Sequence, residues 1–381
     1  MINLKTLTNA YITQKNPMSL VHFITNRCNA RCKHCFIDFD NPEEFKDELT
    51  TEEIVKLTKQ LGDGLINVNI TGGEPFLRSD IYDIVEAYFK NTTIKSVFFT
   101  SHGMYTKRIK AFLDKFMESG IERKVIFSFS ADGIGEEHNE IRRSKGLYDK
   151  MLSTYHMIQD YNTPKIVAKM GITVTDKNYD KVENLYRHLR DVVGVKGITA
   201  TIMREQGVVK LIEPEKKALI LKGYSSLVDM IHQDMVTGRM EGYKKDFHGR
   251  MINAKNMIVN NIQKETYLDP HYVSHCPSGA LFGVIGSKGE VYPCEVLDKQ
   301  LGNLRNYDMD FMALWRDKKT LDVKKFIKET NCNCSYECAW TINTISNKKY
   351  IPRILYNVAR QSISKTGRPV ARSLEVPVDT L

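Results

Sequence analysis

Residues 23–40 read FITNRCNARCKHCFIDFD and place three cysteines, Cys28, Cys32 and Cys35, directly after a short apolar stretch. A structural zinc ion normally takes four protein ligands, and a disulfide joins only two thiols. Three closely spaced thiols therefore indicate a metal centre that keeps one coordination position open for another molecule.

The composition is typical of a globular protein. The chain has 381 residues, of which 42% are hydrophobic and 27% are charged, and this length accommodates one large α/β domain and a smaller one. No run of about eighteen apolar residues occurs, so we expect no transmembrane segment. The first residues lack the charged and then apolar pattern of a signal peptide. We therefore expect a cytoplasmic protein.

The formal net charge is +9, and the C-terminal segment 346–381 is especially basic. Such a segment is either a solvated surface or a site for an anionic partner, such as a phosphorylated sugar, a nucleic acid or a lipid headgroup. The basic residues of this tail are Lys348, Lys349, Arg353, Arg360, Lys365, Arg368 and Arg372.

Apolar strand-like stretches alternate with amphipathic helix-like stretches from about residue 20 to 235, which predicts βαβ units and a parallel sheet. The strands are two fewer than the eight of a closed barrel. We therefore predict an α/β fold built on a partial (β/α)6 TIM-like barrel that is open on one side, with ligands at the carboxyl ends of the strands. The predicted strands are 20–25, 66–71, 96–100, 125–130, 166–175 and 198–203, and the predicted helices are 51–61, 81–90, 106–119, 148–160 and 178–192.

The rest of the chain shows two other patterns. Residues 215–265 have apolar residues at helical spacing, including Met235 and Met257, which we interpret as packing positions. Residues 276–340 indicate short strands and turns. They include a hairpin whose first strand ends before Gly286 and whose second strand begins after Gly289. The predicted divisions are an N-terminal segment (1–20), a core domain (21–235), a helical linker (236–275), a cysteine-rich domain (276–345) and the basic tail (346–381).

The first cysteine group has the spacing Cys-x3-Cys-x2-Cys, and CNARCKHC resembles the cluster motif of the radical S-adenosylmethionine (SAM) enzymes. A zinc site with His34 as the fourth ligand is the alternative, but His34 is adjacent to Cys35, and both would have difficulty reaching one tetrahedral ion. The resemblance implies a [4Fe–4S] cluster held by Cys28, Cys32 and Cys35, whose fourth iron binds SAM. In that family the cluster cleaves SAM, and a 5′-deoxyadenosyl radical removes a hydrogen from the substrate.

A second stretch, TGGEP after the second predicted strand, resembles the SAM-binding motif of the same family. Its glycines, Gly72 and Gly73, allow close approach of the backbone to a ligand. In the family this motif, here with Glu74 and Pro75, holds the amino group of SAM.

Two further stretches match family positions near SAM. FSADG, after the fourth strand, implies that Ser130 lies near SAM and that Asp132 shapes the loop. Arg142 matches an arginine often found near the SAM carboxylate, with a cation on a helix surface as the alternative. Arg204, at the end of the sixth strand, is expected to face SAM or substrate.

Two positions carry weaker signals. TSHG, residues 100–103, stands where relatives usually show Thr-Asn-Gly, so the resemblance assigns no specific role to Ser101 or His102. Lys169 lies inside the fifth predicted strand, where a buried charge would need a partner. We expect it to face outward, with substrate contact as the alternative.

The second cysteine group has the spacing Cys276-x17-Cys294, followed by Cys332-x-Cys334-x3-Cys338. It resembles the SPASM or twitch extension that follows many radical SAM domains. The full SPASM pattern has seven cysteines and two auxiliary clusters, so the five cysteines here imply one auxiliary [4Fe–4S] cluster. Its expected ligands are Cys276, Cys294 and Cys338, with Cys334 or Cys332 as the fourth. A structural zinc ribbon is the alternative.

The resemblance fixes the substrate less well than the cofactors. Relatives with this extension modify ribosomal peptides, mature enzymes, or act on sugars of aminoglycosides and nucleosides. Peptide modifiers often carry a further N-terminal leader-binding domain, and only about twenty residues precede the first strand. We therefore expect dehydrogenation, epimerisation or decarboxylation of a carbohydrate-like or nucleotide-linked small molecule, with ribosomal peptide or protein maturation as the alternative. The resemblance also implies an electron donor such as flavodoxin or ferredoxin.

A different class of protein also matches the composition. Eight cysteines and a positive net charge are compatible with a non-enzymatic zinc and nucleic-acid-binding protein. That hypothesis leaves the TGGEP motif after a strand unexplained.

Metal content tests the two hypotheses. Anaerobic reconstitution should give a brown protein with about eight iron atoms per chain, because each cluster contains four. Replacement of Cys28, Cys32 and Cys35 by alanine should abolish reductive cleavage of SAM, measured as 5′-deoxyadenosine. A colourless protein that holds zinc, or a triple variant that still cleaves SAM, would contradict the prediction.

Overall fold

The structure is a computed structural model that describes residues 4–363, apart from 206, 208, 210–211 and 241–245. Its centre is a nine-stranded sheet with the order β6-β5-β4-β3-β2-β1-β7-β8-β9. Neighbouring strands from β6 to β7 pair in parallel, whereas β8 and β9 add an antiparallel end. The strands are β1 (Ser19–Thr25), β2 (Asn67–Gly72), β3 (Ser96–Ser101), β4 (Lys124–Ser130), β5 (Ile166–Val174), β6 (Ile198–Ile202), β7 (Phe282–Ile285), β8 (Glu290–Tyr292) and β9 (Gly302–Asn303).

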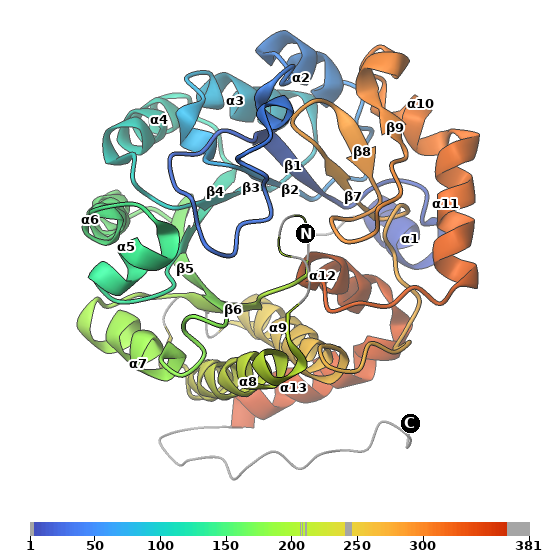
Figure 1. Cartoon of the computed structure of the whole chain (residues 1–381). Helices are drawn as coiled ribbons and strands as arrows, with labels where there is room; N and C mark the ends of the chain where they lie inside the picture. Colours follow the sequence, from blue (N-terminus) through green and yellow to red (C-terminus); the bar gives the residue numbers. More distant parts are fainter. Residues whose placement is uncertain (1–3, 206, 208, 210–211, 241–245, 364–381) are drawn as a thin grey trace.

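The helices of the core surround the parallel strands, and those of the C-terminal part lie beside β7–β9 and across the open side of the barrel (Figure 1). The helices are α1 (Leu4–Thr8), α2 (Thr51–Thr58), α3 (Ile81–Asn91), α4 (Thr106–Glu118), α5 (Glu136–Arg142), α6 (Leu147–Gln159), α7 (Val182–Arg187), α8 (Pro214–Thr237), α9 (Phe247–Thr266), α10 (Phe311–Arg316), α11 (Lys318–Glu329), α12 (Glu337–Ser346) and α13 (Ile351–Ile363).

The predicted partial (β/α)6 barrel is confirmed, and strands β1–β6 agree with the predicted strands within one residue at each end. The predicted helix 178–192 begins only at Val182. The reason is that the side chain of Asn178 accepts a hydrogen bond from the backbone N–H of Thr175 at 2.8 Å and donates one to the carbonyl of Asp132 at 2.9 Å, which holds the preceding turn. The short helix α5 was not predicted.

The main core lies between the sheet and the outer helices. Phe76, Phe99, Phe112 and Phe127 form an aromatic cluster there, with ring centroids 5.1 to 5.8 Å apart in five of its pairs. All four side chains are buried, so each contributes a large apolar area to the stability of the barrel.

The inner side of the barrel is polar. Along β4 and β5, fully buried residues alternate with half-buried ones. The half-buried set includes Ser128, Ser130 and Thr173, which line a cavity inside the barrel. The two-residue repeat of a strand therefore separates the apolar core from this polar interior.

The C-terminal extension shares the sheet with the barrel. Strand β7 pairs in parallel with β1, with Leu20 opposite Gly283. The predicted hairpin is confirmed as β7 and β8, with Val284 opposite Tyr292. The extension is therefore fixed directly to the strand that precedes the first cysteine group.

The prediction of only short strands and turns over 276–340 was wrong for part of that range. Helices α10 and α11 occupy much of 311–329, and α12 begins at Glu337. The side chains of Asp310 and Asp317 accept hydrogen bonds from the first turns of α10 and α11 at 2.9 Å. These N-cap aspartates were the sequence signal for the helices.

The helical interpretation of 215–265 is confirmed by α8 and α9. Met235 and Met257 are buried within the core, as packing residues are. Part of the expected basic tail is helix α13, which packs on α9, whereas Lys365, Arg368 and Arg372 lie outside the described residues. Among the described helices, none is long and apolar enough to cross a membrane.

Candidate functional site

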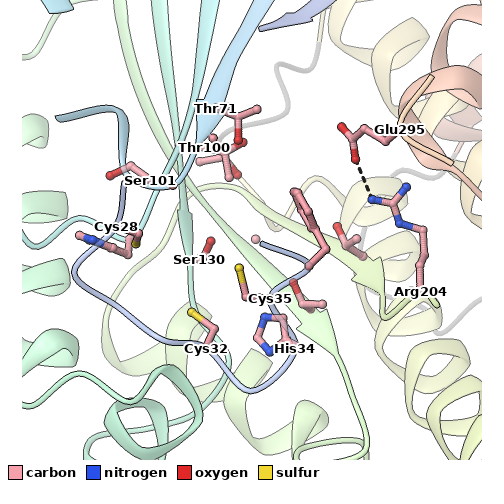
Figure 2. A pocket seen from close by; sticks show the side chains of 18 of the residues that line it. Cys28, Cys32, His34, Cys35, Thr71, Thr100, Ser101, Ser130, Arg204 and Glu295 are labelled. Atoms are coloured by element: carbon pink, nitrogen blue, oxygen red, sulfur yellow. Dashed lines mark hydrogen bonds and ion pairs between the residues drawn. The ribbon is translucent and has the colours of Figure 1, made fainter. Parts of the chain in front are cut away.

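A cavity of about 320 Å³ lies at the carboxyl ends of the parallel strands. The first cysteine group, the Gly72–Gly73 turn and the ends of β3–β6 line it from the barrel, and Glu295, Glu337 and Cys338 line it from the extension. Figure 2 shows Cys32 and Cys35 on one side of this space and Arg204 with Glu295 on the other. The cavity therefore lies between the two parts of the chain.

The loop that carries the first cysteines, residues 26–35, is fixed by backbone hydrogen bonds to the end of α5. The N–H of Arg31 donates to the carbonyl of Arg142 at 3.1 Å, and the N–H of Lys33 donates to that of Ile141 at 3.0 Å. We call residues 26–35 the cysteine loop. Helix α5, absent from the prediction, thus positions the loop.

Burial raises the pKa of the Cys28 thiol to about 12, and the charges of Glu74, Cys32 and Cys35 act in the same direction. Burial also raises the pKa of Cys35. A metal centre reverses this effect, because its positive charge favours the thiolate form. Within the described residues, no three cysteine, histidine or carboxylate side chains already converge on one metal position. The donor set itself, three thiols on one loop that line one cavity, fits an iron–sulfur cluster.

Arg142 lies beside the cysteine loop, but its charge is already paired. One guanidinium nitrogen is 2.6 Å from the buried carboxylate of Asp132, and the other donates to the Cys32 sulfur at 3.4 Å. His34 also faces Asp132, at 3.6 Å, and burial lowers the pKa of His34 to about 4. The structure therefore places Arg142 against Cys32, a predicted cluster ligand, and a carboxylate, and its contact with SAM stays a prediction.

The backbone of the TGGEP turn presses against the cysteine loop. A Cβ atom on Gly72, whose φ is +132°, would lie 1.9 Å from the carbonyl oxygen of Thr25, and one on Gly73 would lie 2.1 Å from that of Arg27. Both distances are far inside van der Waals contact. The two glycines are therefore required for the turn to reach the cavity next to the cysteines.

Glu74 is buried and fully engaged within the protein. Its carboxylate accepts from the hydroxyl of Ser101 at 2.9 Å and from the backbone N–H groups of His102 at 2.9 Å and Phe76 at 3.1 Å. Pro75 is also buried and begins a short helical turn. Glu74 thus joins the end of β2 to the end of β3, and the binding of the SAM amino group by this motif stays a prediction.

His102 connects β3 to the cysteine loop. Its Nε2 lies 2.9 Å from the side-chain oxygen of Asn29, while Nδ1 accepts from the N–H of Met104 at 3.1 Å. Burial lowers the pKa of His102, which favours this neutral tautomer. Sequence analysis gave His102 no role, because the residue departs from the family pattern.

The wall opposite the cysteine loop contains Arg204. Its guanidinium lies 3.0 Å from the carboxylate of Glu295 and 4.4 Å from the ring centre of Tyr336. Burial raises the pKa of Glu337, which lines the same wall. Sequence analysis missed Glu295 and Glu337, although each is adjacent in sequence to a cysteine, Cys294 or Cys338.

Ser130 lines the cavity as predicted, together with other hydroxyl groups of the strand ends, including Thr71 and Thr100. The expectation that Lys169 faces outward was wrong. Lys169 occupies the inward side of β5 with Thr173, its ammonium lies 5.4 Å from the ring centre of Phe98, and burial lowers its pKa. Alternate residues of a strand point to the same side of the sheet, so Lys169 shares the inward side with Thr173.

The second cysteine group lies in the extension. Burial raises the pKa of Cys294, and Cys276 and Cys334 add to the shift. Cys332 is similarly affected by Cys276 and Cys294. Cys338, by contrast, lines the barrel cavity, where burial and the carboxylates of Glu337 and Glu295 raise its pKa. The thiols of Cys276, Cys294, Cys332 and Cys334 are electrostatic neighbours of one another. The choice of four ligands among the five cysteines stays a prediction.

Two protein families match the chain. The Radical SAM superfamily matches residues 23–189, and SPASM, an iron-sulfur cluster-binding domain, matches residues 276–339. The chain therefore contains a radical SAM domain followed by a SPASM domain. Its core domain therefore binds a [4Fe–4S] cluster with SAM, and its SPASM domain holds an auxiliary iron–sulfur cluster.

Curated relatives include two proteins of Bacillus subtilis (strain 168). The antilisterial bacteriocin subtilosin biosynthesis protein AlbA is 22% identical over 296 residues, which are 76% of this chain and 57% of AlbA. The sporulation killing factor maturation protein SkfB is 23% identical over 320 residues, 84% of this chain and 69% of SkfB. The alignments thus span about 57 to 69% of the length of these relatives.

Solved structures share the fold of this radical SAM protein. Native anSMEcpe with bound AdoMet has a TM-score of 0.58 at 19% identity and covers 90% of this chain and 98% of its own. Streptococcus suis SuiB bound to S-adenosylmethionine has a TM-score of 0.56 at 16% identity and covers 82% of this chain and 68% of its own.

The close approach of the TGGEP turn gives a test. Gly73→Ala places a methyl group 2.1 Å from the carbonyl of Arg27, so the turn or the cysteine loop must move. We expect the affinity for SAM to fall by at least about tenfold, since 1.4 kcal/mol suffices for that change. Equilibrium dialysis of reconstituted protein measures it. Gly120→Ala is the control for backbone strain without a clash, because its φ is +68° but its Cβ has no neighbour within 4 Å, and equal SAM affinity in the two variants would contradict the interpretation.

The bridge between β3 and the cysteine loop gives a second test. His102→Ala removes the hydrogen bond to Asn29, a loss of about 1 kcal/mol that should loosen the loop. We expect several-fold slower reductive cleavage of SAM and a weaker electron paramagnetic resonance signal from the SAM-bound reduced cluster. His156→Ala, at an exposed site on α6, should change neither. A normal signal and rate for His102→Ala would show that the bridge is dispensable.

Proposed function

We propose that this radical SAM protein modifies a peptide, using the 5′-deoxyadenosyl radical to abstract a hydrogen atom from it. The observation that carries the proposal is the shared cavity, which the cysteine loop lines on one side and residues of the SPASM domain line on the other. A substrate in this space would contact both the SAM site and the extension.

The comparisons favour a peptide over the carbohydrate or nucleotide-linked substrate expected from the sequence. AlbA and SkfB are named for the biosynthesis of a bacteriocin and the maturation of a killing factor. One anSMEcpe structure contains AdoMet with the Cp18Cys peptide, and one SuiB structure contains the precursor peptide SuiA. Their low identity supports the substrate class without identifying a particular peptide.

The bound cluster and SAM would supply the radical chemistry, and the residues of this chain would position the reactants. The Gly72–Gly73 turn exposes backbone at the cavity next to the cysteine loop, and the hydroxyl of Ser130 supplies a hydrogen-bonding group on the barrel wall. The pairing of Arg142 with Asp132 and Cys32 fixes the loop from the other side. An electron donor such as flavodoxin or ferredoxin belongs to the same proposal.

Substrate turnover tests the proposal. Anaerobically reconstituted enzyme, SAM and reduced flavodoxin would be incubated with synthetic peptides encoded by short reading frames next to its gene, and separately with UDP-glucose. We expect one peptide to increase the yield of 5′-deoxyadenosine and to change in mass or in deuterium content. Loss of two hydrogens would mean dehydrogenation, and loss of a carboxyl group would mean decarboxylation. A mass that is unchanged in ordinary water, with uptake of deuterium when the reaction is run in D2O, would mean epimerisation.

The variant with Cys28, Cys32 and Cys35 replaced by alanine is the control for background reactions. Modification of UDP-glucose, with every peptide unchanged, would contradict the proposal and return the substrate to the nucleotide-linked class.

A further inference from the structure

Arg204 lines the cavity and has one unsatisfied edge. Its Nη2 is held by Glu295 at 3.0 Å, and its guanidinium lies over the ring of Tyr336. Its Nη1 is buried and has no hydrogen-bond partner among the residues that the structure describes. Because a buried N–H without an acceptor is unfavourable, this edge is suited to a group that the substrate brings.

The charge of the guanidinium is already balanced. Glu295 pairs with it directly, and Glu337, whose Oε2 is also buried without a hydrogen-bond partner in the described part of the chain, lines the same wall. The other arginine of the cavity, Arg142, is paired with Asp132. Lys169 lies deeper on β5 and is not among the lining residues. No described cation that lines the cavity therefore lacks a carboxylate partner.

This balance decides which acceptor the edge can take. A phosphate or carboxylate next to Arg204 would place a further negative charge near the Glu295 carboxylate, where partial burial strengthens the repulsion. A neutral carbonyl oxygen would satisfy Nη1 without that penalty. The hydroxyl groups around the cavity, including Thr199 and Thr201, are likewise suited to neutral polar groups.

We propose that Nη1 of Arg204 donates a hydrogen bond to a neutral carbonyl oxygen of the substrate, a backbone amide or a side-chain carboxamide, and that the cavity discriminates against phosphate-bearing molecules. The inference rests on the proposed peptide function and names the chemical group that the extension side of the cavity binds. Glu295 acts through Arg204 as a positioning residue, since it holds the guanidinium that carries the free edge.

The first experiment uses the peptide that the enzyme modifies. Arg204→Ala should raise the KM for that peptide by about 10- to 100-fold, the range for loss of a charged hydrogen bond. Arg204→Lys should show a similar rise, because an ammonium group drawn to Glu295 lacks the planar fork that directs a second N–H into the cavity. Circular dichroism and iron content should match those of the unaltered enzyme in both variants, which shows that they fold and hold their clusters.

Arg187→Ala is the matched control, because Arg187 pairs with Glu183 on the exposed side of α7. It should leave the KM unchanged. If Arg204→Ala modifies the peptide with the KM of the unaltered enzyme, the inference is wrong while the proposed function stands.

The second experiment does not require the peptide. Equilibrium dialysis of the SAM-loaded holoenzyme against UDP-glucose should show no binding that depends on Arg204, so the unaltered enzyme and Arg204→Ala should agree. Binding of UDP-glucose that is lost in Arg204→Ala would overturn the inference whichever substrate the enzyme uses. If no peptide is modified, the proposed function fails, and this second measurement still decides the inference.

Discussion

The cysteine loop is held in a fixed position between two backbone contacts, and the rest of the site depends on that position. On one side, the N–H groups of Gly73 and Glu74 donate to the carbonyls of Thr25 and Arg27 at 2.7 and 2.9 Å. On the other side, loop N–H groups donate to carbonyls at the end of α5. The loop forms neither helix nor strand, so its backbone groups need these external partners. The barrel supplies them from two separate places, the turn that follows β2 and the end of helix α5.

Much of this arrangement could be predicted because its signals are local. Strands β1–β6 follow from alternating or continuous apolar runs between helical patterns, and the TGGEP turn follows from two adjacent glycines after a strand. The parallel pairing of β7 with β1 could not be predicted, since more than 250 residues separate Val21 from Val284 and no short-range pattern records the contact. The two-residue repeat of β5 predicts that Lys169 points inward. The outward orientation was expected instead because burial of a charge is unfavourable.

The site residues that sequence analysis missed have a common feature: they act through partners distant in sequence. The role of His102 depends on its contact with Asn29. The role of Glu295 depends on its contact with Arg204, which lies 91 positions away. A residue that departs from a family motif, as His102 does, gives no indication of its role in the sequence until its contact partner is known. The cysteines were identifiable without partners, because clustering of thiols is itself the signal.

The positions of Glu295 and Glu337 connect the auxiliary cluster to the cavity wall that contains Arg204. Each is adjacent in sequence to a cysteine of the second group, so assembly of a cluster there would fix the backbone that carries both carboxylates. Tyr336 adds to this connection, since its hydroxyl donates to Glu295 at 2.6 Å while its ring faces Arg204. Metal binding in the extension would thus affect the shape of the cavity, because the same backbone carries the cysteines and the residues of the cavity wall. On this argument the SPASM domain organises the substrate side of the cavity, in addition to any role in electron transfer.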